Sequence, residues 1–263
     1  MKMMVSSEGF KPMKHHADGR GYPHFYKKVH FLDRGDPNKK GEEVSQTFIP
    51  LLMRNGKNSS HWQAKRPEGA RTSHQRKALA NWLTDVENGA GYVAARVIVN
   101  RLWLHHFGHG LVATPNDFGY QSEPPTHPEL LDWLASRLIE NNWRLKPMHK
   151  LILSSAAWRQ SSSYDEAKAA KDLANQLLWR FTPRRLEGEV IRDSLLIVSG
   201  QLDKAMYGKG TLDERSKRRS VYFFIKRSRL IPTMQLFDAP EPLVSQGRRL
   251  STTIAPQALM FMN

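Results

Sequence analysis

The stretch at residues 92–107 constrains the fold more than any other, because as a helix it is apolar on nearly every side. Such a helix is typical of the middle of a domain, where polar groups must find partners. We therefore predict a buried helix here, with its polar side chains paired or lining a cleft. Its apolar side chains are Val93, Val97, Ile98, Val99, Leu102, Trp103 and Leu104.

This helix nevertheless carries two pairs of polar side chains, and the two members of each pair are four residues apart. Arg96 and Asn100 share one flank, and Arg101 and His105 share another. After a glycine-containing break, the loop at residues 114–119 offers a hydroxyl, an amide and a carboxylate. We expect this loop to return to the helix and supply partners. The candidate cleft consists of Arg96, Asn100, Arg101, His105, His106, Asn116, Asp117 and His127.

Apolar residues at helical spacing recur along the chain and predict a mainly α-helical, multi-helix domain. Thr126 and Glu129 form a capping-box pattern, which predicts a helix starting at Thr126. Further helices are expected from Ser73, from Pro147, over residues 182–200, and from Pro232 and Pro256.

A small β element is expected beside the helices. Residues 25–34 alternate well enough for a short strand, and the β-branched and aromatic stretch at 219–227 is expected to pair with residues 29–32. Residues 55–70 are polar, which predicts a linker or a surface excursion. The predicted domains are a loop-rich N-terminal segment over residues 1–70 and a helical core domain over residues 71–263.

The chain is strongly basic, with 40 Lys and Arg against 25 Asp and Glu and a net charge of +15. This charge favours an anionic partner, such as an acidic polysaccharide, nucleic acid or an acidic neighbouring domain. A solvated basic surface is the simpler interpretation. Basic residues also flank the aromatic residues at 222–224, as in sites for single-stranded nucleic acid. The candidate polyanion-binding residues are Arg215, Lys217, Arg218, Arg219, Lys226, Arg227 and Arg229.

The sequence excludes several classes of function. It has no cysteine, which rules out disulfides, thiolate metal sites, a cysteine nucleophile and haem attached through CxxCH. No nucleophile elbow, Walker loop, Rossmann glycine pattern or HExxH motif occurs. No cofactor is therefore indicated, and no apolar run approaches the roughly 20 residues that span a bilayer.

Histidines and carboxylates leave two chemical alternatives open. His105 and His106 with Asp117 would suit zinc or iron, although hydrogen-bonded core histidines are the competing interpretation. The N-terminal histidines His15, His16, His24 and His30 would bind metal only if their loop folded back.

Glu189 and Asp193 lie four residues apart on the helix expected at 182–200, a spacing that can raise a carboxyl pKa for acid–base work. An ion network of Glu189 with Arg185 and Arg192 is the simpler interpretation.

Five motifs in one order give the chain a family resemblance. They are RVIVNRLWLHHFGHGLVATPNDFG, PPTHPELLDWLA, PRRLEGEVIRDSLLIVSGQLD, FDAPEP and STTIAPQALMFMN. Over residues 32–263 the chain resembles the planctomycete-type domain of unknown function, family 1553 of such domains. The resemblance implies a fragment of a large exported or cell-envelope protein whose partners are its sister domains, a cytochrome c-like segment and a second uncharacterised domain. It implies no reaction.

These observations favour a non-catalytic interaction or scaffolding module whose basic surface meets an anionic polymer or a sister domain. A metal-dependent hydrolase or redox enzyme with its site around residues 96–119 is the first alternative, and nucleic-acid binding is the second.

Overall fold

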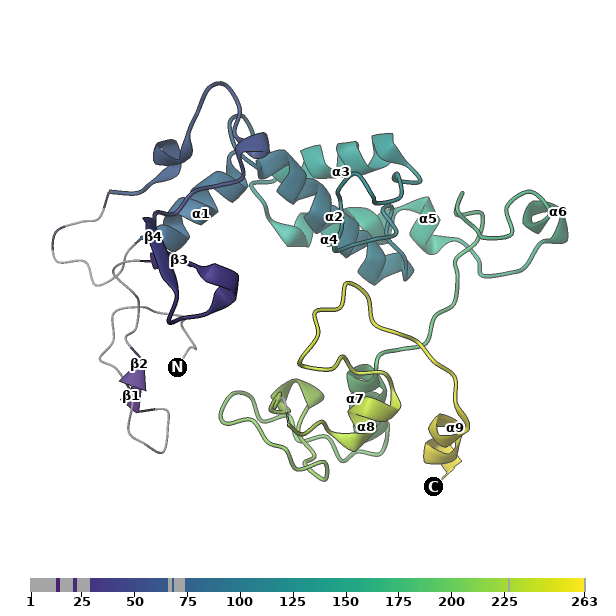
Figure 1. Cartoon of the computed structure of the whole chain (residues 1–263). Coiled ribbons are helices and arrows are strands. Elements are labelled where there is room, and N and C mark those ends of the chain that lie inside the picture. Colours follow the sequence, from purple (N-terminus) through teal and green to yellow (C-terminus); the bar gives the residue numbers. More distant parts are fainter. Residues whose placement is uncertain are drawn as a thin grey trace. The chain divides into compact units, whose positions relative to one another are not determined.

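The computed structural model describes residues 13–14, 21–22, 29–65, 68, 74–226 and 228–262. Within them the chain is mainly α-helical, with nine α-helices and two small antiparallel sheets, which confirms the predicted fold class (Figure 1). The chain divides into two compact units, Met1–Ile98 and Val99–Asn263, so that helix α2 (Gly91–Phe107) contributes to both. The domain boundary near residue 70 stays a prediction.

The elements follow in chain order. The first unit contains β1 (Met13–Lys14), β2 (Gly21–Tyr22), β3 (Val29–Leu32), the 3-10 helix η1 (Asp33–Gly35), β4 (Lys40–Val44), the 3-10 helices η2 (Pro50–Leu52) and η3 (Ser59–Trp62), and α1 (Gln75–Thr84). The second contains α3 (Pro128–Glu140), α4 (Leu145–Ser154), α5 (Ala156–Arg159), α6 (Glu166–Ala169), α7 (Gly188–Val198), the 3-10 helix η4 (Ser220–Tyr222), α8 (Pro232–Leu236) and α9 (Ala255–Met262). No helix in the described part of the chain is long and apolar enough to cross a membrane.

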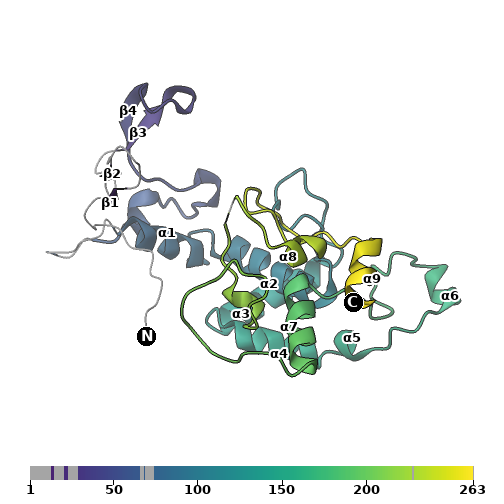
Figure 2. The ribbon, with the colours of Figure 1, turned by 90° about the horizontal axis from the view of Figure 1, so that it is seen from below.

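The strands pair locally. β1 pairs with β2, and β3 pairs with β4 as an antiparallel hairpin in which Val29 lies opposite Val44 (Figure 2). The expected pairing of residues 29–32 with 219–227 is therefore wrong. The later stretch forms η4 and isolated bridges instead. Closing a short hairpin loop costs less chain entropy than joining two distant segments, which favours the local partner.

An aromatic cluster forms the core of the first unit. The Trp82 ring stacks on Phe48 with centroids 5.1 Å apart, and Trp62 meets Phe48 edge-on at 5.8 Å. Trp62 is only 3% exposed, and its indole N–H donates to the Asp85 carboxylate at 2.9 Å, at the end of α1. The linker interpretation of residues 55–70 is therefore wrong at Trp62.

The second unit packs its helices through aliphatic and aromatic side chains. Leu131, Leu134 and Leu138 are buried along one face of α3, which packs against α4 (Figure 1). On α2 the Phe107 ring stacks on Trp103 with centroids 4.2 Å apart and meets Trp158 edge-on. The region is therefore a conventional helical core around the C-terminal part of α2.

One predicted helix start and one predicted capping box are wrong. α3 begins at Pro128, and its N-cap is His127, which makes no side-chain cap bond. The Thr126 backbone N–H, which Glu129 would accept in a capping box, donates to the Leu111 carbonyl at 2.8 Å. Thr126 and Glu129 therefore form no capping box. α7 begins at Gly188, well after the expected start at residue 182. The arginines before it instead reach out to distant segments of the second unit.

Candidate functional site

Asn100 anchors the turn that follows α2. It is fully buried, its amide N–H donates to the Val112 carbonyl oxygen at 3.1 Å, and its Oδ1 accepts the Val112 N–H at 2.9 Å. A Cβ on Gly110 would lie 2.7 Å from this Oδ1 and could not be accommodated. The expectation that polar groups on α2 find buried partners is confirmed for Asn100, which is an internal anchor.

Arg101 is exposed, which excludes a buried pair and leaves the expected alternative, a place in the wall of a cleft. Its guanidinium donates to the Asn116 side-chain oxygen at 2.7 Å, so the loop at 114–119 does return to α2. Asp117 takes no part in that return, because its carboxylate accepts the Gly119 N–H at 2.8 Å within its own turn.

Arg101 and His105 line a cavity of about 400 Å³ together with residues from two remote segments, 182–187 and 246–251. Arg184 donates to the His105 carbonyl oxygen at 2.5 Å, in the last turn of α2, where carbonyls lack helical partners. We call this cavity the arginine cleft. Its cationic and imidazole residues are Arg101, His105, His109, Arg184, Arg185, Arg248 and Arg249.

Close packing positions the segment that carries Arg248. A Cβ added to Gly247 would lie 2.9 Å from Pro115 and 3.0 Å from Asn116, so only glycine fits against this loop without a shift. The loop at 114–119 therefore has two roles. It holds Arg101 through Asn116, and it seats the backbone next to Arg248.

Two of the arginines in the cleft are neutralised. Arg185 pairs with Asp238 at 2.6 Å, and Asp238 also accepts the Thr252 N–H and hydroxyl at 2.8 Å each. Arg249 forms a bidentate pair with Glu189 at 2.6 and 2.9 Å.

The other three arginines keep unbalanced charge. Arg101, Arg184 and Arg248 have no carboxylate partner among the residues that the structure describes. Of the residues lining the cleft, Glu187 is the single carboxylate, and it lies 3.6 Å from Arg249. The arginine cleft is therefore a cationic surface.

The histidines divide between the cleft and the core. Burial lowers the pKa of His109 below its ordinary value of 6.5, and Arg248 lowers it further, so the cleft imidazole favours its neutral form. Burial also lowers the pKa of His106, whose Nε2 lies 2.9 Å from His149 Nδ1. The His106 ring meets Trp158 edge-on at 5.3 Å. His106 is thus a hydrogen-bonded residue of the helical core.

The metal candidates are not brought together. No group of three or more histidine and carboxylate side chains among the described residues could hold a metal ion. His105 lies on the cleft wall, His106 contacts His149, and His127 contacts the Thr126 hydroxyl. Arg96 is half-buried on α2. His15, His16 and His24 lie outside the described residues.

The expected ion network within α7 is wrong. Glu189 pairs with Arg249, 60 residues further along the chain, and Arg185 pairs with Asp238. Arg192 is buried and donates to the carbonyls of Arg218 and Ser216. An arginine has five donors, and the guanidinium of Arg192 uses them mainly on loop carbonyls, while its nearest carboxylate, Asp193, lies 3.7 Å away.

Glu189 and Asp193 both have cationic or hydroxyl partners. The Arg249 hydrogen bonds hold the pKa of Glu189 below its ordinary value, and Asp193 accepts the Ser220 N–H and hydroxyl at 2.7 Å each. A raised carboxyl pKa for acid–base chemistry is therefore wrong for Glu189.

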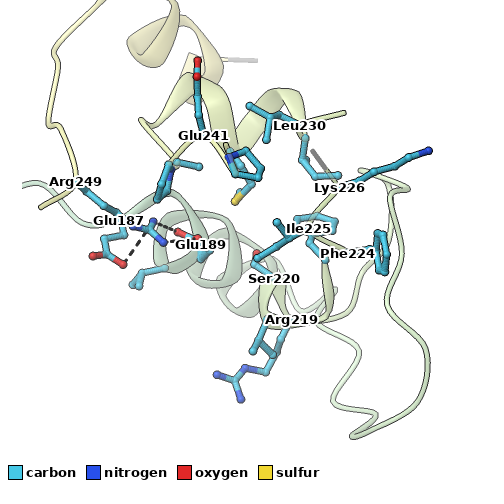
Figure 3. A pocket seen from close by; sticks show the side chains of 18 of the residues that line it. Glu187, Glu189, Arg219, Ser220, Phe224, Ile225, Lys226, Leu230, Glu241 and Arg249 are labelled. Carbon is cyan, nitrogen blue, oxygen red and sulfur yellow. Dashed lines mark hydrogen bonds and ion pairs between the residues drawn. The ribbon is translucent and has the colours of Figure 1, made fainter. Parts of the chain in front are cut away.

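A second and larger cavity, of about 590 Å³, lies beside α7 (Figure 3). We call it the α7 cavity. It is lined by residues 187, 189–190, 193, 219–221, 223–226, 229–231, 234, 239–242 and 249, so that it joins the LEGEVIRD and FDAPEP parts of two separate sequence motifs. The Arg249–Glu189 pair lies at one side of the cavity, and Ile225 and Phe224 lie at the other (Figure 3).

The basic strip predicted for polyanion binding has mixed roles. Arg218 is half-buried, donates to the Tyr207 carbonyl oxygen at 2.5 Å and lies 3.8 Å from the centre of the Tyr222 ring. Arg219 lies 3.7 Å from Asp193. Arg215 and Lys217 are exposed, Lys226 and Arg229 line the α7 cavity, and Arg227 lies outside the described residues. Polyanion binding by this strip stays a prediction.

Comparison with known proteins identifies a family without a known activity. The sequence model of the PSD1 family, protein of unknown function (DUF1553), matches residues 75–263. No curated protein and no solved structure matches the chain. The matched range contains every residue of the arginine cleft and of the α7 cavity. The chain therefore belongs to the PSD1 family of proteins of unknown function (DUF1553).

Proposed function

We propose that this chain is a non-catalytic interaction module that holds an acidic polysaccharide in the arginine cleft. One observation carries the proposal. Arg101, Arg184 and Arg248 come from three separate segments, line one cavity, and have no carboxylate partner among the described residues.

Guanidinium geometry suits this role. Each group has five N–H donors, and Arg101 and Arg184 use only part of them on Asn116 and the His105 carbonyl. The remaining donors match the paired oxygens of carboxylate or sulfate groups. All three arginines are exposed, which lets an extended polymer cross the cleft, and the net charge of +15 attracts a polyanion from solution.

The aromatic residues of the cleft favour a glycan over single-stranded nucleic acid. Nucleic-acid sites of this kind stack bases on exposed aromatic rings. The aromatic lining residues, Phe107 and Phe237, are 5% and 2% exposed and offer no such platform. An acidic sugar can instead be held through charge-assisted hydrogen bonds to its carboxylate or sulfate groups, which need no aromatic platform.

Fluorescence anisotropy with a labelled sulfated or uronic-acid oligosaccharide, titrated at several salt concentrations, tests the proposal. Arg101→Gln and Arg248→Gln should each weaken binding about threefold to tenfold, since each removes one charge-assisted contact. Each should also lower the slope of log affinity against log salt by about 1.

Arg215→Gln is the comparison variant, because Arg215 is exposed, lies outside the cleft lining and belongs to the basic strip predicted for polyanion binding, so that a loss in this variant alone would assign binding to the strip. Unchanged affinity in the Arg101→Gln, Arg248→Gln double variant, or an equal loss in Arg215→Gln, would refute the cleft as the site. Tighter binding of single-stranded DNA of the same charge would move the assignment to nucleic acid.

A further inference from the structure

We propose that the α7 cavity is a second binding site, next to the arginine cleft and sharing Glu187, Pro240 and Arg249 with it, for an amphipathic organic anion. Such a ligand has an apolar chain or ring system and one carboxylate, sulfonate or phosphate head. The proposal rests on the shape and lining of the cavity and on the charges that remain unbalanced at its edge.

The cavity has the size and floor of a small-molecule site. Its volume of about 590 Å³ lies within the range of roughly 300–1,000 Å³ that is common for ligand pockets. Buried Ile231 and Met234 and half-buried Phe223 contribute to its lining. The guanidinium of Arg192 lies 4.6 Å from the centre of the Phe223 ring and fixes it in place.

Apolar side chains also remain exposed around the opening. Val221, Phe224 and Ile225 are 68%, 55% and 79% exposed and belong to one short segment. An exposed apolar cluster of this kind, next to a cavity with an apolar floor, is typical of a binding surface. An apolar ligand body would remove these side chains from water.

The charges around the cavity select the head group. Arg249 pairs with Glu189 and also lies 3.6 Å from Glu187, so this side of the cavity keeps one net negative charge. Asp193 accepts bonds from Ser220 and lies 3.7 Å from Arg219. Lys226 and Arg229 have no carboxylate partner in the described part of the chain, and Glu241 is the one lining carboxylate there without a cationic partner.

The unbalanced positive charge lies at one edge of the α7 cavity. Lys226 extends from the edge beside Leu230 and Ile225, across the cavity from the Arg249 pair (Figure 3). The unbalanced charge at this edge is therefore positive and complements an anionic head.

Anilinonaphthalene sulfonate, an apolar fluorescent anion, and uncharged phenylnaphthylamine form a matched pair of probes. Both should bind, and Ile225→Asp should abolish binding of both by placing a carboxylate among the apolar walls. The double variant Lys226→Gln, Arg229→Gln should weaken the anionic probe about tenfold and change the neutral probe by less than about twofold, since only the first uses the cationic edge.

Competition tests the sign of the head group. Dodecanoate should displace the anionic probe, and dodecylamine, with the same chain and the opposite charge, should not. Equal displacement by the amine would overturn the proposal, as would unchanged binding in Ile225→Asp.

Two controls separate this site from other sources of binding. Val198→Asp changes an exposed apolar residue of α7 outside the cavity and should leave both probes bound, whereas loss of binding there would show nonspecific apolar adsorption. The Arg101→Gln, Arg248→Gln variant should also retain probe binding. Loss of glycan binding with retained probe binding in that variant distinguishes failure of one site from failure of the other.

Discussion

Two regions of the second unit are held together by different forces. Residues 99–159 bury aliphatic side chains such as Leu131 and Leu138, while α7 leaves Val190, Ile197 and Val198 exposed. Residues 182–262 rely instead on arginines that reach carbonyls and carboxylates of remote loops. Those arginines are Arg184, Arg185, Arg192, Arg218 and Arg249.

This difference separates global from local stability. Apolar burial is non-directional and shared by many neighbours, so damage to it weakens the whole packed region. An arginine bonded to a few carbonyls orders one loop, and its removal should lower the stability of that loop alone. The apolar region should therefore respond to lost volume, and the arginine-held region to lost donors.

Leu138→Ala should have the largest effect. The side chain is 0% exposed, so truncation loses apolar contact and leaves a cavity, at a cost of about 3 kcal/mol in the free energy of unfolding. Urea unfolding followed by circular dichroism measures this cost. Leu173→Ala, at a residue 79% exposed, should change it by less than about 0.5 kcal/mol. A similar loss of unfolding free energy in the two variants would show that burial does not stabilise the apolar region as proposed.

Arg192→Met should have a smaller and local effect. It leaves the Ser216 and Arg218 carbonyls without this donor, at a cost of about 2 kcal/mol. Hydrogen exchange should accelerate over residues 203–224 while α3 stays protected. Arg192→Lys should restore little, because a single ammonium cannot span the same acceptors. Accelerated exchange in α3 would show that the two regions unfold together.

Acid should weaken the two regions in different pH ranges, with the smallest effect. His106 has a lowered pKa in the folded state, so its contribution is complete above the ordinary value of 6.5 and is lost as pH falls below it. Glu189 has a lowered pKa too, so its contribution is complete above 4.5 and is lost below that value.

Hydrogen exchange, corrected for its intrinsic pH dependence, should thus show opening near α2 before opening near α7 on acidification. His106→Gln should remove the first step and Glu189→Gln the second. Opening in the reverse order would contradict these assignments.

The sequence predicted those helices and contacts that depend on apolar periodicity or on residues close together in the chain. The bounds of α2, the buried face of α3 and the return of Asn116 to Arg101 all follow from apolar spacing or from partners about 15 residues apart. The capping box failed because Thr126 is held by the Leu111 carbonyl, a competitor that local pattern does not contain.

The arginine cleft could not be assembled from sequence. Arg184 meets α2 across 79 residues, and its acceptor is a carbonyl, which every residue carries and no motif distinguishes. The sequence does contain one indication of the cleft, which is Gly247. A glycine directly before two arginines can indicate that the backbone passes close to another segment, as it does at Pro115.

The bond between Asp238 and Thr252 makes the intervening chain a ring closed at its base. α8 lies before this ring and α9 after it, and neither depends on its length. Insertions or deletions at its tip should therefore be cheap, because extending a tethered loop adds little closure entropy. Arg248 should keep its place under such changes, because Gly247 packs against Pro115 and Asn116 and Arg249 pairs with Glu189. The ring therefore joins a tip whose length can vary to a base that is fixed, so that the charges of the cleft and the helices on either side are left intact.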